Sequence, residues 1–276
     1  MNAAATLPTL PDTRDRLVIA TPCAGGNVKL RYMNGLIRAC TELAVDVSTG
    51  DGGMRRQPLV GGRMFLETES HIDRARNKLS NRFLLDTDLN WLLFIDADIA
   101  FDPAHVLALW QHGQRGHRIV AATYAQKRLR LQYTAVPHPG ASVDADGLVQ
   151  VDHAGTGFML IHREVFAALA DRGLAPNYRL GAHEGDAQRH PEYRAYFKSG
   201  VREQVAADGR TEAIWLSEDF MFCREVAQCG FRIMLDRHIA LGHMGDLTYP
   251  PPVGELVDAV KALRAGAHPD LPAEPI

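Results

Sequence analysis

Two aspartates separated by a single residue, directly after an apolar run, are the first residues whose types and spacing suggest chemistry. They lie in the stretch WLLFIDADIAFDP at 91–103. The bulky residues at 91–95 predict a buried central strand, and Asp96 and Asp98 follow it, with Asp102 just beyond. Carboxylates crowded at a strand end repel one another unless a positive group lies among them. Residues two apart on a strand share a face, so Asp96 and Asp98 could converge on Mg²⁺ or Mn²⁺. The competing interpretation is a solvated strand end beside a helix cap.

A second acidic pair, Glu218 and Asp219, begins the stretch EDFMFCREVAQCGFRI. Ser217 precedes the pair and could cap a helix that runs to about residue 229. The helix dipole favours negative charge in the first turn, so good capping alone would explain both carboxylates. If the pair faces a cleft, one carboxylate could instead be a general base.

His243 lies between Gly242 and Met244 at the end of a late apolar segment. A lone histidine is most often structural. Its ring nitrogen could also join Asp96 and Asp98 around one ion, and such a mixed oxygen and nitrogen site suits Mn²⁺.

The stretch AGTGFMLIH places Gly155, Thr156 and Gly157 between two predicted strands. Two glycines allow a close approach of backbone to a ligand. The pattern lacks the full dinucleotide-binding signature and does not follow the first strand, which excludes that kind of site.

The elements that must position these residues alternate along the first half of the chain. Strands are predicted at 16–21, 44–48, 91–95 and 118–124, with helices at 28–43, 70–85 and 103–113 and a glycine-rich loop or irregular hairpin at 50–62. This order predicts an α/β domain with a mainly parallel central sheet. Ligands of such sheets bind at the carboxyl ends of the strands, where Asp96 and Asp98 would lie.

The second half is less regular. It predicts strands at 148–153, 157–162, 231–236 and 238–243, and helices at 163–171, 217–229 and 254–265, while 173–213 has no pattern. We therefore expect a disordered lead at 1–15, one domain at 16–250 and a C-terminal helix and tail at 251–276.

Composition limits the alternatives. A formal net charge of −3 over 276 residues gives no electrostatic reason to expect strong nonspecific DNA binding. The four cysteines form no CxxC pair, which argues against a disulfide framework or a zinc site. The first residues lack a signal pattern, and no apolar run reaches about 18 residues, so we expect a cytoplasmic protein.

Four stretches in this order, FIDADI, GTGFMLIHREVF, LSEDFMFCREVAQCGFRI and LGHMG, resemble the GT-A class of nucleotide-sugar glycosyltransferases. The similarity is greatest to bacterial and phage enzymes related to Anp1-type and family-2-like transferases. The early stretches VIATPCAGGNV and HIDRARN are similar too, so the resemblance covers roughly 17–249. It implies a GT-A fold, which is a Rossmann-like, mainly parallel sheet flanked by helices with a small additional antiparallel sheet.

The resemblance also implies roles, with 16–125 as the nucleotide-binding half and 126–250 as the acceptor and metal half. Asp98 would bind a metal, Mn²⁺ or Mg²⁺, that bridges the donor's diphosphate, and Asp96 would contact the ribose or the metal's waters. His243 matches the third metal ligand, and the Glu218–Asp219 pair matches an ED motif whose Asp is the general base of inverting members. The implied donor-binding residues are Thr21, Pro22 and Cys23 at the base, Arg74, Arg76 and Asn77 on a helix, Asp96 and Ala97 after the central strand, and Gly155, Thr156 and Gly157 on the sugar and acceptor side.

The expected activity is a metal-dependent transfer of a sugar from a nucleotide-sugar to a hydroxyl, with a UDP-sugar favoured over a GDP-sugar. The acceptor stays open between a glycan, a small metabolite and a hydroxymethylated base in phage-type DNA. The stretch TYAQKR at 123–128 stands where the family has a YPxK-like stretch, so Lys127 receives no role. Two alternatives remain: a nucleotidyltransferase or another metal-dependent phosphate enzyme, and a non-catalytic module that binds nucleotide-sugars.

Overall fold

The computed structural model describes residues 13–48, 51–127, 132–205, 209–245 and 248–249. The last three residues of the expected lead form a 3₁₀ turn, η1 (Thr13–Asp15). The rest of that lead and the expected helix at 254–265 lie outside the described residues.

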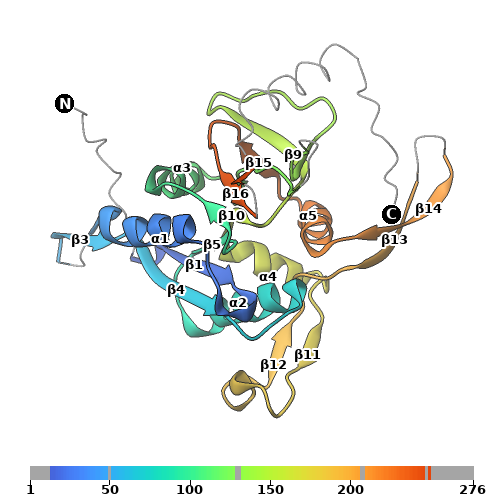
Figure 1. Ribbon diagram of the computed structural model, residues 1–276, viewed down its shortest axis with the longest axis horizontal. Helices are drawn as coiled ribbons and strands as arrows, with labels where there is room; N and C mark the ends of the chain where they lie inside the picture. The colour runs from blue at the N-terminus through green and yellow to red at the C-terminus, as the bar shows by residue number, and fades with distance from the viewer. Residues whose placement is uncertain (1–12, 49–50, 128–131, 206–208, 246–247, 250–276) are drawn as a thin grey trace.

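A single eight-stranded sheet organises the chain (Figure 1). Its strands lie in the order β4 (Val60–Leu66), β1 (Leu17–Pro22), β5 (Trp91–Ile95), β10 (Phe158–His162), β7 (Ile119–Ala121), β15 (Ile233–Asp236), β9 (Leu148–Ala154) and β8 (Ala135–Pro137). The strands β10 and β9 are antiparallel to their neighbours, and the others share one direction. The sheet is therefore mixed, and all of its strands except β9 and β10 run in one direction.

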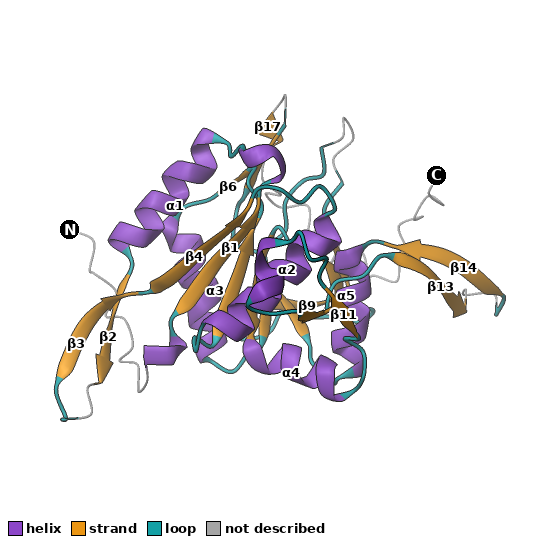
Figure 2. Ribbon diagram, turned by 90° about the horizontal axis from the view of Figure 1, so that it is seen from below, coloured by secondary structure: helices purple, strands orange, loops and turns teal. Residues whose placement is uncertain are grey.

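Helices cover both faces of this sheet (Figures 1 and 2). Alternation along β5 divides the core, because Leu93 packs on one side while Leu92 and Phe94 pack on the other. The first side meets α1 (Leu30–Glu42) and α3 (Pro103–Gln114), and the second meets α2 (Ile72–Asp86), α4 (Arg163–Asp171) and α5 (Glu218–Gln228). The helices predicted at 28–43, 70–85, 103–113, 163–171 and 217–229 are confirmed, with their ends shifted by at most two residues.

The strand predicted at 44–48 does not join the central sheet. It is β2 (Ala44–Ser48), which pairs with β3 (Met54–Pro58) as a separate hairpin. The place beside β1 belongs to β4, in a stretch that its glycines made look like a loop. A Cβ on Gly61 would lie 2.7 Å from Leu89 Cδ1, so the glycine allows this edge strand to pack closely.

A small antiparallel sheet confirms another expectation. It contains β17 (Thr248–Tyr249), β16 (Gly242–Met244) and β6 (Ile99–Ala100). The strand predicted at 238–243 is thus shorter and begins later. The pairing of His243 with Ile99 brings the histidine to the residues that follow β5.

The patternless stretch at 173–213 forms two hairpins. One is β11 (Asn177–Arg179) with β12 (Glu192–Arg194), which also carries the 3₁₀ turn η3 (Gly185–Gln188). The other, β13 (Gly200–Val205) with β14 (Thr211–Leu216), projects from the body of the molecule (Figure 2).

Two asparagines of α2 hold the first hairpin by its main chain. The Asn77 side chain donates to Phe197 O at 2.7 Å and accepts from Phe197 N at 2.8 Å. One helical turn later, the Asn81 side chain bonds both main-chain groups of Arg194 at 2.9 Å. The helix therefore pairs with residues 194–197 much as a neighbouring strand would.

No helix within the described ranges combines the length and apolarity that crossing a membrane requires.

Replacing Asn77 with alanine should lower the free energy of unfolding by roughly 2–4 kcal/mol, because it leaves the buried N–H and C=O of Phe197 without partners. Urea denaturation measures the loss. Asn34→Ala, at an exposed position of α1, is the control and should change stability by no more than about 0.5 kcal/mol. Equal effects of the two variants would contradict the assigned contact.

Candidate functional site

A cleft of about 880 Å³ opens at the carboxyl ends of β1 and β5. Stretches far apart in the sequence meet there, as the sheet topology requires. Its lining comprises Pro22, Cys23, Ala24, Asn27, Val28, Lys29, Ile72, Arg76, Asp96, Ala97, Asp98, Tyr124, Thr134, Asp219 and His243.

The buried guanidinium of Arg76 joins the two acidic motifs. Its Nη1 lies 3.2 Å from Asp96 Oδ1, and its Nε lies 3.3 Å from Glu218 Oε1. The guanidinium also lies over the Phe94 ring, 5.5 Å from the centroid. Burial raises the pKa of the Glu218 carboxyl, and the charge of Arg76 opposes that rise only in part. Arg76 therefore lines the cleft, where the sequence predicts a donor-binding residue, with its charge compensated by two carboxylates.

Asp98 and His243 form the second contact across the cleft. His243 Nδ1 lies 2.7 Å from the carbonyl oxygen of Ala125, which can only accept, so Nδ1 carries the proton. Nε2 is then left facing Asp98 Oδ1 at 3.5 Å. The ammonium of Lys127 pairs with the other oxygen, Asp98 Oδ2. Burial favours the neutral acid, but the interactions with His243 and Lys127 outweigh it and lower the pKa of Asp98.

These residues meet the chemical requirements of a metal site only in part. Asp98 and His243 offer one oxygen and one nitrogen donor, and the carbonyl that fixes the imidazole is the usual outer support of a metal-binding histidine. Asp96 is turned toward Arg76 instead. Within the part of the chain that the structure describes, no three His, Cys, Asp or Glu side chains are grouped to hold an ion. Asp98 and His243 therefore fit a metal site in which oxygens of a bound ligand complete the coordination.

The two residues of the ED pair lie differently. Glu218 is buried against Arg76, whereas Asp219 lines the cleft. Asp219 Oδ1 accepts from the Ser217 hydroxyl and from Phe220 N, the latter at 2.8 Å. Ser217 precedes α5 as predicted but makes no side-chain capping bond, because its hydroxyl bonds Asp219. Of the two, Asp219 is the carboxylate that can meet a ligand in the cleft.

Tyr124, to which sequence reasoning gave no role, explains the glycines at 155 and 157. Its buried hydroxyl accepts a hydrogen bond from Gly157 N at 3.0 Å. A Cβ on Gly155 would lie 2.7 Å from that hydroxyl, and one on Gly157 would lie 2.6 Å from Asp96 Oδ2. Both glycines therefore leave room for Tyr124 and Asp96. They and the fully buried Thr156 are not among the residues that line the cleft.

The remaining predicted donor-binding residues divide into two groups. Pro22, Cys23 and Ala97 line the cleft, and burial raises the pKa of the Cys23 thiol. Thr21, Arg74 and Asn77 do not. Thr21 is buried and bonds the Tyr32 hydroxyl, Asn77 holds Phe197, and Arg74 pairs with Glu69 and Glu184 beside a separate cavity of about 340 Å³.

Sequence reasoning gave no role to Tyr124 or Lys127, although both lie in the stretch TYAQKR, at the end of the strand predicted at 118–124. That position alone was the available signal, because residues that follow parallel strands gather at one edge of the sheet. Lys29 and Thr134 were also missed and line the same cleft.

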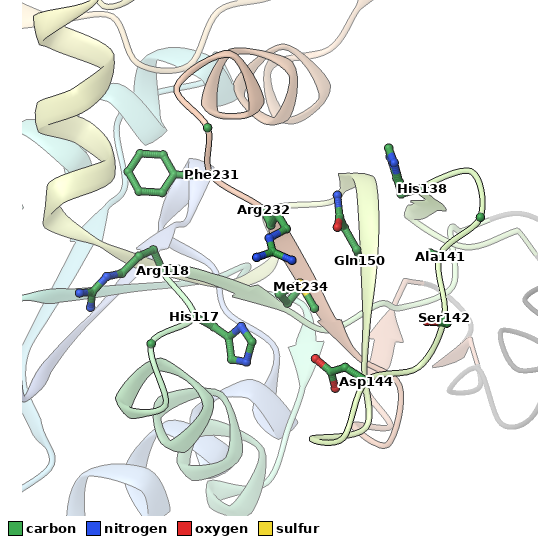
Figure 3. Close-up of a pocket in the computed structure, with 13 residues that line it drawn as sticks. His117, Arg118, His138, Ala141, Ser142, Asp144, Gln150, Phe231, Arg232 and Met234 are labelled. Carbon is green, nitrogen blue, oxygen red and sulfur yellow. The ribbon is translucent and has the colours of Figure 1, made fainter.

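Another cavity, of about 490 Å³, lies at the end of the sheet opposite to the cleft. Its residues 116–118 and 230–232 precede β7 and β15, so it lies at the amino ends of these strands. Figure 3 shows His117, Asp144 and Arg232 around it. None of the residues predicted to do chemistry lines it.

Comparison with solved structures identifies the fold. The chain is similar to the crystal structure of A197 from STIV, with a TM-score of 0.50 and 16% sequence identity, over 86% of this chain and 94% of that chain. The chain has a GT-A-like α/β fold. At this identity the similarity shows the fold alone.

A second structure, 2-C-methyl-D-erythritol 4-phosphate cytidylyltransferase from Thermus thermophilus, overlaps over 90% of this chain and 99% of that chain. Its TM-score is 0.35 and its identity 15%, too low to indicate a shared fold. No protein-family model and no curated protein match the sequence.

Replacing Arg76 with methionine should lower the free energy of unfolding by about 3–5 kcal/mol at pH 7, because the buried Glu218 and the partly buried Asp96 lose their compensating charge. Arg76→Lys keeps the charge and should lose less. The difference between wild type and Arg76→Met should shrink as the pH falls, because Glu218, with its raised pKa, takes up a proton and no longer needs a cation. Urea denaturation at several pH values measures it. A loss below about 1 kcal/mol would show that the pairs act like exposed ones.

Proposed function

We propose that the chain transfers a sugar from a nucleotide-sugar, first of all a UDP-sugar, to a hydroxyl group of an acceptor in a divalent-metal-dependent reaction. The observation that carries the proposal is the meeting of Asp98, Asp219 and His243 with Pro22 and Cys23 in one cleft. The GT-A-like fold supports it by analogy only, since one fold serves many activities.

The size and lining of the cleft suit a nucleotide. About 880 Å³ lies within the range of small-molecule sites. Pro22, Val28 and Ile72 supply apolar surface for a base, and the ammonium of Lys29 supplies positive charge for phosphate. Arg76 also lines the cleft but already pairs with Asp96 and Glu218, so we assign it to holding Asp96 in place rather than to the donor.

Asp98 and His243 would hold the metal, with Asp96 beside them. The carbonyl of Ala125 accepts the hydrogen bond from Nδ1, which keeps the imidazole in the tautomer whose Nε2 can give its lone pair to the ion. When bound, Mn²⁺ or Mg²⁺ would act as a Lewis acid that stabilises the charge developing on the departing diphosphate.

Asp219 would take the proton from the acceptor hydroxyl as the general base of an inverting transfer. The Ser217 hydroxyl and Phe220 N both bond its Oδ1, which orients the carboxylate. Glu218, the other half of the predicted catalytic pair, would act through Arg76 as a positioning residue.

A thermal-shift panel of UDP, GDP, CDP and dTDP, each with and without Mn²⁺, tests the donor and the metal together. We expect UDP to give the largest rise in melting temperature, and to need Mn²⁺ for it, because a ligand that binds the native state stabilises it. Asp98→Asn should abolish the metal-dependent part. Asp102→Asn is the matched control, because this carboxylate caps α3 outside the cleft. No metal-dependent shift with any nucleotide would contradict the proposal.

Asp219→Asn should lower kcat for UDP release from the preferred UDP-sugar by roughly 10²–10⁴-fold, because the variant cannot accept the proton. The thermal shift with UDP and Mn²⁺ should stay unchanged. Asp171→Asn, at an exposed position at the end of α4, should leave both quantities as in wild type. Turnover at the wild-type rate in Asp219→Asn would remove this residue from the mechanism.

A further inference from the structure

Lys127 pairs with Asp98, the carboxylate that the proposed metal would need as a ligand. Its ammonium pairs with Asp98 Oδ2, while His243 faces the other oxygen, Oδ1, at 3.5 Å. The three side chains are accessible to different degrees: Lys127 is 38% exposed, Asp98 26% and His243 14%. The lysine therefore lies on the solvent side of the pair and can leave without disturbing the core.

A lysine and a divalent cation cannot share this carboxylate favourably. An ammonium has three donors and no acceptor, so it cannot ligate a metal. Placed within a few ångströms of the ion, it would repel it, and this repulsion is large in a partly buried cleft. Binding of the ion at Asp98 thus requires Lys127 to move away.

The charges of the cleft indicate how Asp98 is compensated. Arg76 compensates Asp96 and Glu218, whereas Asp98 is compensated by Lys127. Without the lysine, Asp98 would add an unbalanced charge next to Asp96. Lys127 therefore supplies at Asp98 the positive charge that a metal ion would supply.

The segment that carries Lys127 also positions the histidine. The carbonyl of Ala125, two residues earlier, accepts from His243 Nδ1. Gln126 N donates to Gln132 O at 2.7 Å, and Ala125 pairs with Tyr133, which fixes the main chain. The backbone is held while the long side chain of Lys127 remains able to change partner.

From these contacts we propose that Lys127 and a divalent cation compete for Asp98. When the ion binds Asp98, the displaced ammonium of Lys127 pairs with the donor's diphosphate instead. Lys127 thereby makes metal and nucleotide bind cooperatively, and by linkage each raises the affinity for the other equally. This inference rests on the proposed function, because it requires a diphosphate ligand and a metal at Asp98.

Mn²⁺ titrations followed by the electron paramagnetic resonance signal of the free ion test it, with and without saturating UDP. Without UDP, Lys127→Met should bind Mn²⁺ roughly three- to tenfold more tightly than wild type, because a competing ion pair is gone. UDP should raise the Mn²⁺ affinity of wild type by at least about fivefold and that of Lys127→Met by less. Lys127→Arg keeps the competing charge and should behave like wild type.

Arg31→Met is the control. It removes a cation at an exposed position of α1, outside the cleft. It should change the nucleotide-free Mn²⁺ affinity by less than about twofold, because exposed charges at a distance are screened by salt.

The outcomes separate the two proposals. If Asp98→Asn abolishes Mn²⁺ binding but Lys127→Met binds it no more tightly than wild type, the competition is wrong and the metal site stands. If neither wild type nor Lys127→Met binds Mn²⁺ with or without UDP, the competition and the metal dependence of the proposed function are both wrong.

Discussion

The buried guanidinium of Arg76 is the interaction on which the rest of the site depends. It brings a carboxylate from the end of the central strand and one from the start of α5 to the same side chain of α2. Charges taken out of water are tolerated only when they are paired, so the three elements must stay in register with one another. Asp96 and Glu218 pair with Arg76, while Asp98 and Asp219, which follow them in the two motifs, line the cleft together with Asp96. In each motif, the residue bound to Arg76 therefore fixes where the following carboxylate meets the cleft.

Much of this architecture follows from local patterns. The alternation of apolar strands with amphipathic helices predicts the layered α/β core, and the run at 91–95 predicts the central strand at its correct limits. Carboxyl ends of parallel strands meet at one edge of a sheet, so the residues after β5 could be expected near those after β1. That Asp219 and His243 join Asp96 and Asp98 was predicted by the family resemblance alone, because α5 follows β14 and His243 lies on β16, and neither strand belongs to the central sheet.

What sequence reasoning missed depends on contacts between distant residues. The strand β4 carries Gly61 and Gly62, which reduce strand propensity, and only the close approach of Leu89 and Val18 makes glycine fitting there. The glycines at 155 and 157 look like a ligand-binding pair, whereas the structure places the Tyr124 hydroxyl where their side chains would be. No periodicity in the sequence encodes Tyr124 as the neighbour of these residues. Likewise, nothing local distinguishes Arg74, at the surface, from Arg76, two residues later and buried.

The asparagine pair on α2 has a consequence for how changes in the hairpin reach the cleft. Asn77 and Asn81 bond the peptide groups of Arg194 and Phe197, and the ion pair of Arg82 with Asp186 joins the same helix to the hairpin. Arg76, the residue before Asn77, belongs to the site. One helix therefore holds the cleft on one side and the hairpin on the other. A rearrangement of the hairpin that rotates or shifts α2 would thus also move the guanidinium that pairs with Asp96 and Glu218.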